Sequence, residues 1–137
     1  QRKLCCRWAG LHLLLAEDNE LNSEIATALL EEAGASITAV ENGRLALEAI
    51  QNAAPHTYDA ILMDVMMPEM NGLEATRCIR AFEGKGPGEG TPIIAMTANV
   101  FADDVKACLD AGMNSHVGKP LDMKVLIGEI LKYTDAH

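Results

Sequence analysis

Short apolar runs recur along the chain, and each is followed by a segment whose apolar residues have helical spacing. Strands of a parallel sheet are buried on both faces, so their sequences form nearly continuous hydrophobic runs rather than an alternation. The runs therefore predict five buried strands, which we place at residues 11–16, 36–40, 58–63, 92–96 and 114–117.

The intervening segments repeat apolar residues every three or four positions, which is the spacing of one face of an α-helix. In the first predicted helix, residues 19–33, the repeat includes Leu21, Ile25 and Leu29. In the third helix, the predicted inner face ends at Phe82. Polar residues suited to capping the first turn stand at the start of three helices, namely Asn42, Asn71 and Asp122.

Strict alternation of five strands with five helices decides the predicted fold class. Such alternation favours a parallel sheet with helices on both faces. Because crossovers between parallel strands are right-handed, the sheet is wound in both directions from its first strand. The predicted class is therefore α/β, with a doubly wound, five-stranded parallel sheet.

Composition and charge fit one globular domain. A chain of 137 residues with 49% hydrophobic residues can bury a single core. No apolar run approaches the ~20 residues of a membrane-spanning helix. The net charge of −9 argues against a nucleic-acid-binding surface, which needs a basic patch. The four cysteines lack CxxC spacing, so we expect free thiols rather than a zinc site.

The two ends of the chain are assigned to tails. Residues 1–10 are basic and lack the apolar core of a signal peptide, so we interpret them as a linker tail. The domain itself is predicted to span 11–133, with a C-terminal tail at 134–137. The glycine-rich stretch 84–90 leads from a helix to a strand, unlike a phosphate-binding loop, and we interpret it as a connection.

Residues of related chemistry stand where the predicted strands end. They are Glu17 and Asp18 after the first strand, Asp64 after the third, Thr97 after the fourth and Lys119 after the fifth. The carboxyl ends of parallel strands meet at one edge of a sheet, where ligands bind. Carboxylates gathered there would repel one another, and a hard cation such as Mg²⁺ relieves this repulsion. A nucleophilic carboxylate beside a metal, a hydroxyl and a lysine makes a phosphoryl-accepting site.

Together these motifs resemble the receiver domains of two-component response regulators, over residues 11–131. The resemblance implies a flavodoxin-like (βα)5 fold with strand order 2-1-3-4-5. It implies that Asp64 is the phosphorylated aspartate. Asp18 would bind Mg²⁺ directly and Glu17 through water, with the backbone carbonyl of Met66 as a further ligand. Mn²⁺ could replace Mg²⁺ in such a site.

The same resemblance assigns roles near the last two strands. The Thr97 hydroxyl, the Ala98 amide and Lys119 would contact the phosphoryl group, and Lys119–Pro120 would be a cis peptide. Thr97 would also act as the switch residue. The position three before the lysine is often Tyr or Phe in the family, whereas this chain has His116. This departure bears on the family's aromatic switch and not on phosphorylation itself.

The sequence around the motifs resembles that of receiver domains attached to hybrid sensor histidine kinases. A stand-alone single-domain response regulator would show the same sequence features. Either reading implies phosphoryl transfer from a histidine kinase or a histidine phosphotransfer domain onto Asp64. The domain would catalyse only its own phosphorylation and dephosphorylation. It would lie in the cytoplasm, without touching nucleic acid or membrane, and in the hybrid case as part of a membrane-bound kinase. Dimerisation could use the fourth helix, fifth strand and fifth helix.

Three rival functions share parts of this pattern. A flavin mononucleotide binder needs a Ser/Thr-rich phosphate loop after strand one, where this chain has Glu17 and Asp18. A haloacid-type phosphatase carries a second aspartate two residues after the first, where this chain has Met66. A non-phosphorylated interaction module would lack some of the acids or Lys119. Binding of beryllofluoride with Mg²⁺ would separate a phosphorylatable receiver from all three.

Overall fold

The computed structural model describes residues 11–32, 34–53, 57–65, 71–84, 90–97, 102–118 and 123–134. Strands and helices alternate throughout, as predicted. The elements are β1 (His12–Ala16), α2 (Glu20–Glu32), β2 (Ser36–Val40), α3 (Gly43–Asn52), β3 (Ala60–Asp64), α4 (Gly72–Glu83), β4 (Ile93–Thr97), α5 (Ala102–Ala111), β5 (Ser115–Gly118) and α6 (Met123–Thr134). The predicted domain limits at 11 and 133 stay predictions.

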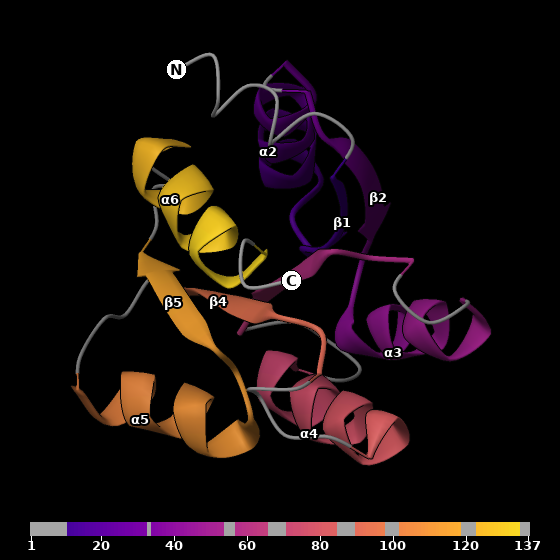
Figure 1. Cartoon of the computed structure of the whole chain (residues 1–137), viewed down its shortest axis with the longest axis vertical. Coiled ribbons are helices and arrows are strands. Elements are labelled where there is room, and N and C mark those ends of the chain that lie inside the picture. The colour runs from indigo at the N-terminus through magenta and orange to yellow at the C-terminus, as the bar shows by residue number, and fades with distance from the viewer. Residues whose placement is uncertain are drawn as a thin grey trace.

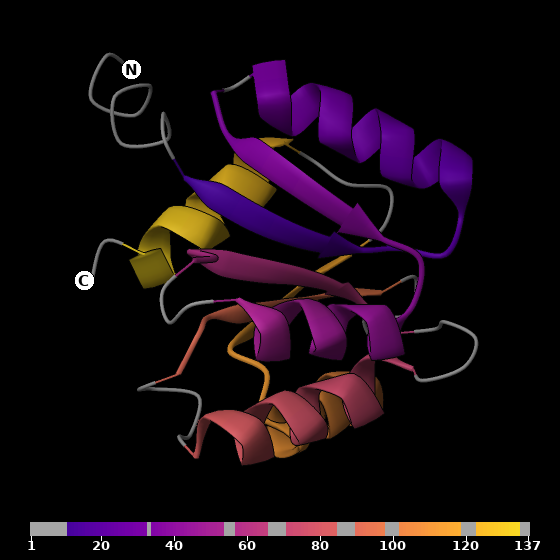
Figure 2. The ribbon, with the colours of Figure 1, turned by 90° about the vertical axis from the view of Figure 1, so that its right-hand side faces the viewer.

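The five strands form one parallel sheet in the order β2-β1-β3-β4-β5. Helices α2 and α6 cover one face, and α3, α4 and α5 cover the other (Figures 1 and 2). The chain therefore winds outward in both directions from β1. The predicted α/β class, doubly wound sheet and strand order are confirmed.

Each face of the sheet builds its own apolar layer, because successive side chains of a strand point to opposite faces. In β1, Leu13 and Leu15 join the layer under α2 and α6. Leu14, which lies between them, joins the layer under α3, α4 and α5. All three side chains are fully buried. This explains why the strand sequences are apolar without a gap.

Helix α2 packs on the sheet through a face other than the one its apolar repeat suggests. Leu21, Ile25 and Leu29 are 64%, 49% and 39% exposed, whereas Ala26 and Leu30 are buried. The repeat correctly predicted a helix. Its sequence is apolar on two sides, however, and the small Ala26 side chain lets the other side approach the strands. An apolar stripe consequently remains on the surface.

The predicted inner face of α4 is wrong at its last position. Thr76 and Ile79 are fully buried, but Phe82 is 51% exposed. A helix has 3.6 residues per turn, so a buried stripe drifts by one position within two turns. The inward positions of the last turn are Arg80 and Glu83, whose side chains are 9% and 13% exposed.

Side-chain caps begin two helices where they were predicted. Asn42 Oδ1 accepts a hydrogen bond from Leu45 N at 2.8 Å, and Asn71 Oδ1 accepts one from Glu74 N at 2.9 Å. Asp122 lies outside the described residues. Among the helices that are described, none combines the length and the apolar character needed to cross a membrane.

Candidate functional site

Asp64 is the last residue of β3, the central strand of the sheet, and it is only 4% exposed. It pairs with Met96 of β4, and the next residue, Val65, donates its backbone N–H to Met96 O at 3.2 Å. The pairing of β3 with β4 thus continues through Asp64 to Val65. This places Asp64 at the carboxyl edge of the sheet, as predicted.

Glu17 and Asp18 form the turn between β1 and α2. The backbone N–H of Glu17 donates to Val40 O at 3.1 Å, which ties the turn to the end of β2. The Glu17 carboxylate accepts the N–H of Asn19 at 3.2 Å. Asn19 in turn caps α2, since its side chain accepts the N–H of Asn22 at 3.0 Å. The acidic pair is therefore fixed from both neighbouring elements.

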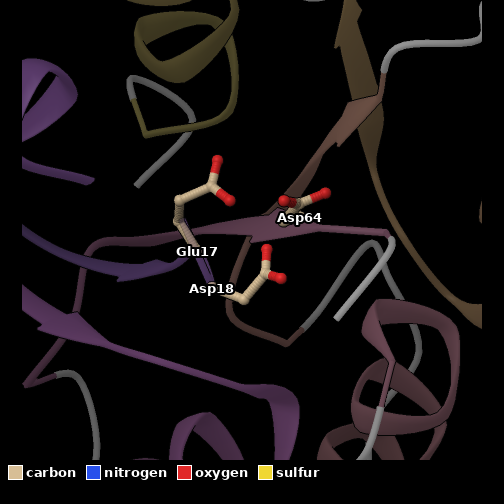
Figure 3. A group of neighbouring side chains, drawn as sticks. All are labelled: Glu17, Asp18 and Asp64. Atoms are coloured by element: carbon tan, nitrogen blue, oxygen red, sulfur yellow. The ribbon is translucent and has the colours of Figure 1, made fainter. Parts of the chain in front are cut away.

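The carboxylates of Glu17, Asp18 and Asp64 come together at this edge (Figure 3). One oxygen from each lies within 4.8 Å of the others. Glu17 is 5% exposed, whereas Asp18 is open to solvent. Three negative charges at this spacing repel one another unless a cation lies between them. The donor set consists of oxygens alone, which fits a hard divalent cation better than zinc or copper.

A residue that the sequence pattern did not single out also shapes the site. Gly72 opens α4 and packs against the backbone that carries Asp64. A Cβ on Gly72 would collide with the carbonyl oxygen of Asp64 and would stand 3.0 Å from Val65 Cα. The N–H of Gly72 donates to Val65 O at 3.0 Å. Only a glycine lets α4 begin this close, and the Asn71-Gly72 pair was its sole signal in the sequence.

The remaining predicted site residues are placed only in part. Thr97 ends β4 at the same edge, where its backbone pairs with Gly118 of β5. His116 lies on β5 opposite Ala95 and is half-buried. The other predicted residues, Met66, Ala98, Lys119 and Pro120, lie outside the described residues, so their roles stay predictions.

Comparison with known proteins fits this arrangement. The family model described as the response regulator receiver domain matches residues 13–131. This chain belongs to the receiver domain family. The receiver is similar to "Probable histidine kinase 1" of Oryza sativa subsp. indica, with 40% identity over 82% of the chain. It spans only 14% of that protein, so the match concerns one domain of a much longer chain.

Two solved receivers share the fold. The receiver domain of the sensor histidine kinase PA1611 from Pseudomonas aeruginosa PAO1 has 38% identity and a TM-score of 0.80, covering 93% of this chain and 99% of that one. That structure carries a magnesium ion in its active site cleft. The receiver of Ssk1 from Saccharomyces cerevisiae, solved with the histidine phosphotransfer protein Ypd1, has 26% identity and a TM-score of 0.81. The match covers 91% of this chain and 89% of that one.

Proposed function

We propose that this receiver accepts a phosphoryl group on Asp64 while Glu17, Asp18 and Asp64 hold a Mg²⁺ ion. The observation that carries the proposal is the group of three carboxylates within 4.8 Å, two of them almost fully buried. The ion would neutralise these charges and those of the incoming phosphoryl oxygens. The magnesium in the PA1611 receiver supports this assignment.

The chemistry is an in-line transfer. An Asp64 carboxylate oxygen forms a bond to phosphorus while the bond from phosphorus to the donor imidazole nitrogen breaks. The electron pair of the broken bond stays on that nitrogen. We propose that the Thr97 hydroxyl, the Ala98 amide and Lys119 bind the transferred oxygens. The Met66 carbonyl would be a further metal ligand, Thr97 and His116 would form the switch, and Lys119–Pro120 would be cis.

The test is phosphorylation by acetyl phosphate with Mg²⁺, followed by intact mass. The wild-type chain should gain one phosphoryl group, and Asp64→Asn should gain none. Asp110→Asn is the matched control, because Asp110 is an exposed carboxylate on α5. A phosphoryl adduct of equal yield on Asp64→Asn would refute the assignment. Beryllofluoride binding that requires Mg²⁺ would separately argue against a flavin binder, a phosphatase and a non-phosphorylated module.

We propose that a histidine phosphotransfer domain docks on the exposed stripe of α2. A donor imidazole must reach Asp64, so the donor has to cover the edge at which α2 begins. The stripe of Leu21, Ile25 and Leu29 starts there. Helix α2 contains four glutamates and no basic residue, so the fitting partner surface is apolar with a basic rim. The Ypd1–Ssk1 complex supports a partner of this class.

Docking and chemistry can be measured separately. Ile25→Glu should slow phosphoryl transfer from a phosphorylated histidine phosphotransfer protein at least tenfold and leave phosphorylation by acetyl phosphate unchanged. Gln51→Glu, at an exposed position of α3 on the other face of the sheet, is the control for an added acid. Equal transfer rates for Ile25→Glu and wild type would show that the donor binds elsewhere.

We infer that the receiver is the cytoplasmic part of a hybrid sensor histidine kinase. In the cytoplasm, ATP would supply the phosphoryl group that the kinase histidine passes to this receiver. The long histidine kinase relatives support this origin. Dimerisation through α5, β5 and α6 stays a prediction, and the exposed side chains of Leu109 and Val125 lie on the first and last of these elements.

A further inference from the structure

A buried arginine lies at the edge of the sheet opposite Asp64. Arg80, in the last turn of α4, is 9% exposed. Its guanidinium donates to Gly112 O at 2.9 Å, to Glu83 Oε1 at 2.9 Å, to Thr91 O at 2.8 Å and to Asn114 Oδ1 at 2.8 Å. One side chain therefore joins the end of α4 to the segments that lead into β4 and β5.

The partners of Arg80 extend these links. Glu83 Oε2 accepts the backbone N–H of Thr91 at 3.1 Å and its hydroxyl at 2.6 Å. Asn114 Oδ1 also accepts the N–H of Ile93 at 2.9 Å, and the N–H of Asn114 donates to Ile93 O at 2.8 Å. The first residue of β4 is thereby locked to the residue before β5. We call Arg80, Glu83, Thr91 and Asn114 the arginine clamp.

Two glycines make room for the clamp. Gly112 has a φ of +111°, and a Cβ there would stand 2.9 Å from Arg80 Cγ. A Cβ on Gly90 would stand 2.5 Å from Arg80 Nη1 and would collide with the Glu83 carboxylate. The chain is thus shaped around the ion pair on two sides.

A contribution to stability alone does not explain why a charged side chain, Arg80, is buried at this position. Burial removes hydration from both ions, and a pair of apolar side chains often packs equally well. Desolvation lowers the pKa of Arg80, while the hydrogen bond and charge of Glu83 raise it. What a guanidinium provides, and an apolar side chain does not, is a fixed set of directions for its hydrogen bonds. The clamp is therefore suited to setting the axial register of the strands it joins.

The register of β4 and β5 matters at the other edge. Ile94 pairs with Ser115 beside the clamp, and Thr97 pairs with Gly118 at the functional edge. Lys119 follows Gly118 in the sequence. A slip of one residue would shift the end of β5 by about 3.3 Å and turn its side chains to the other face. Both proposed side-chain contacts of the phosphoryl group, Thr97 and Lys119, depend on this pairing.

We propose that Arg80 is a positioning residue for the phosphoryl-binding half of the site. It acts through the β4–β5 register and has no part in holding the metal, whose proposed side-chain ligands lie in the turn after β1 and at the end of β3. This inference rests on the proposed function. It predicts a separation between two measurable properties, because disturbing the clamp should affect phosphoryl binding and spare Mg²⁺ binding.

The experiment compares Arg80→Lys with wild type well below the melting temperature. Lysine keeps the charge and loses the forked geometry. Mg²⁺ affinity, measured by calorimetry, should stay within about twofold of wild type. The affinity for beryllofluoride and the rate of phosphorylation by acetyl phosphate should each fall about tenfold. Arg77→Lys is the matched control, because Arg77 is exposed on the same helix, and it should change neither property.

Each outcome decides between the alternatives. Equal losses of Mg²⁺ and beryllofluoride affinity would show general destabilisation, and no loss of either would show that the register holds without Arg80. Both results overturn the positioning role. If wild type itself takes up neither beryllofluoride nor a phosphoryl group, the proposed function fails and this inference fails with it. If Arg80→Lys does not fold, Asn114→Ala applies the same test, since it removes the shared acceptor and leaves the Arg80–Glu83 pair.

Discussion

Replacing Gly72 by alanine should destabilise the receiver by displacing the strand end that carries Asp64. The added methyl group would meet three neighbours, the Asp64 carbonyl oxygen, Met63 Cγ and Val65 Cα. The Met63 side chain can rotate away. The other two atoms belong to the backbone of β3 and its continuation, so either that segment or the start of α4 has to move.

The loss in the free energy of unfolding follows from the rigid backbone around Gly72. Overpacking at a rigid site costs about 1–3 kcal/mol. For a domain of this size, each kcal/mol lowers the melting temperature by about 3 °C. Gly72→Ala should therefore melt roughly 3–9 °C below wild type. Because the shift occurs beside the nucleophile, the rate of phosphorylation by acetyl phosphate should fall as well.

Gly128 provides a control of opposite sign. It lies within α6, and no heavy atom outside its local helix lies within 4 Å of an added Cβ. Alanine is favoured over glycine in a helix by about 1 kcal/mol, so Gly128→Ala should melt about 3 °C above wild type with unchanged phosphorylation. Circular dichroism on heating gives both shifts. A Gly72→Ala variant that melts at or above the wild-type temperature would refute the steric argument.

Further substitutions probe the metal site, the core and a helix cap. Asp18→Asn should raise the melting temperature of the metal-free protein, because two like charges about 5 Å apart repel by about 1 kcal/mol even in water. It should also abolish the stabilisation that Mg²⁺ gives the wild type, and a stabilisation that persists would exclude Asp18 as a ligand. In urea unfolding, Leu30→Ala should lower the free energy of unfolding by about 2–5 kcal/mol, because Leu30 is fully buried. Leu29 is partly exposed, so Leu29→Ala should lower it by well under about 1 kcal/mol. Similar losses for the two variants would contradict the packing of α2. Asn71→Ala should cost about 1 kcal/mol, because the first turn of α4 loses the acceptor of the Glu74 N–H, and wild-type stability would mean that water replaces the cap.

The fold could be read from the sequence because buried parallel strands leave an unambiguous signal. Leu13, Leu14 and Leu15 are apolar on both faces, and such runs alternate with helical spacing. The predicted limits of β2 agree with the structure, and those of the other strands differ by one or two residues, since hydrogen bonding rather than polarity ends a strand. At the start of β4, for example, the Asn114 side chain takes the N–H of Ile93.

Which face of a helix is buried could be predicted less well. Helix α2 has apolar residues on two sides, and only the packing of Ala26 and Leu30 decides between them. In the last turn of α4, Arg80 is buried and Phe82 is exposed, the reverse of what polarity suggests. Besides Glu83, the acceptors that allow Arg80 to be buried come from residues 11 to 34 positions further along the chain, so no local pattern contains them.

The acidic edge followed from topology, because Glu17, Asp18 and Asp64 are brought together by the alternation of strands and helices. The roles of Met66, Ala98 and Pro120 rest on resemblance alone, whereas that of Lys119 rests also on its position after the fifth predicted strand. The pair Asn71-Gly72 indicated the start of a helix, but the role of Gly72 at the site could not be predicted, because the atom that requires a glycine belongs to Asp64, eight positions earlier. A sequence shows where a glycine stands and not what approaches it.

The parallel sheet also determines where the domain can be tethered. Strand β1 begins, and helix α6 ends, at the edge opposite the three carboxylates (Figure 2). In a longer protein, segments attached before His12 and after Thr134 would therefore start at the edge away from the acidic site. The length of such a linker would set the effective concentration of a donor histidine in the same polypeptide, and so how often that histidine meets Asp64. As long as the linker can span the distance between the two sites, its length could adjust the rate of phosphoryl transfer to Asp64 while every contact in the site stayed the same.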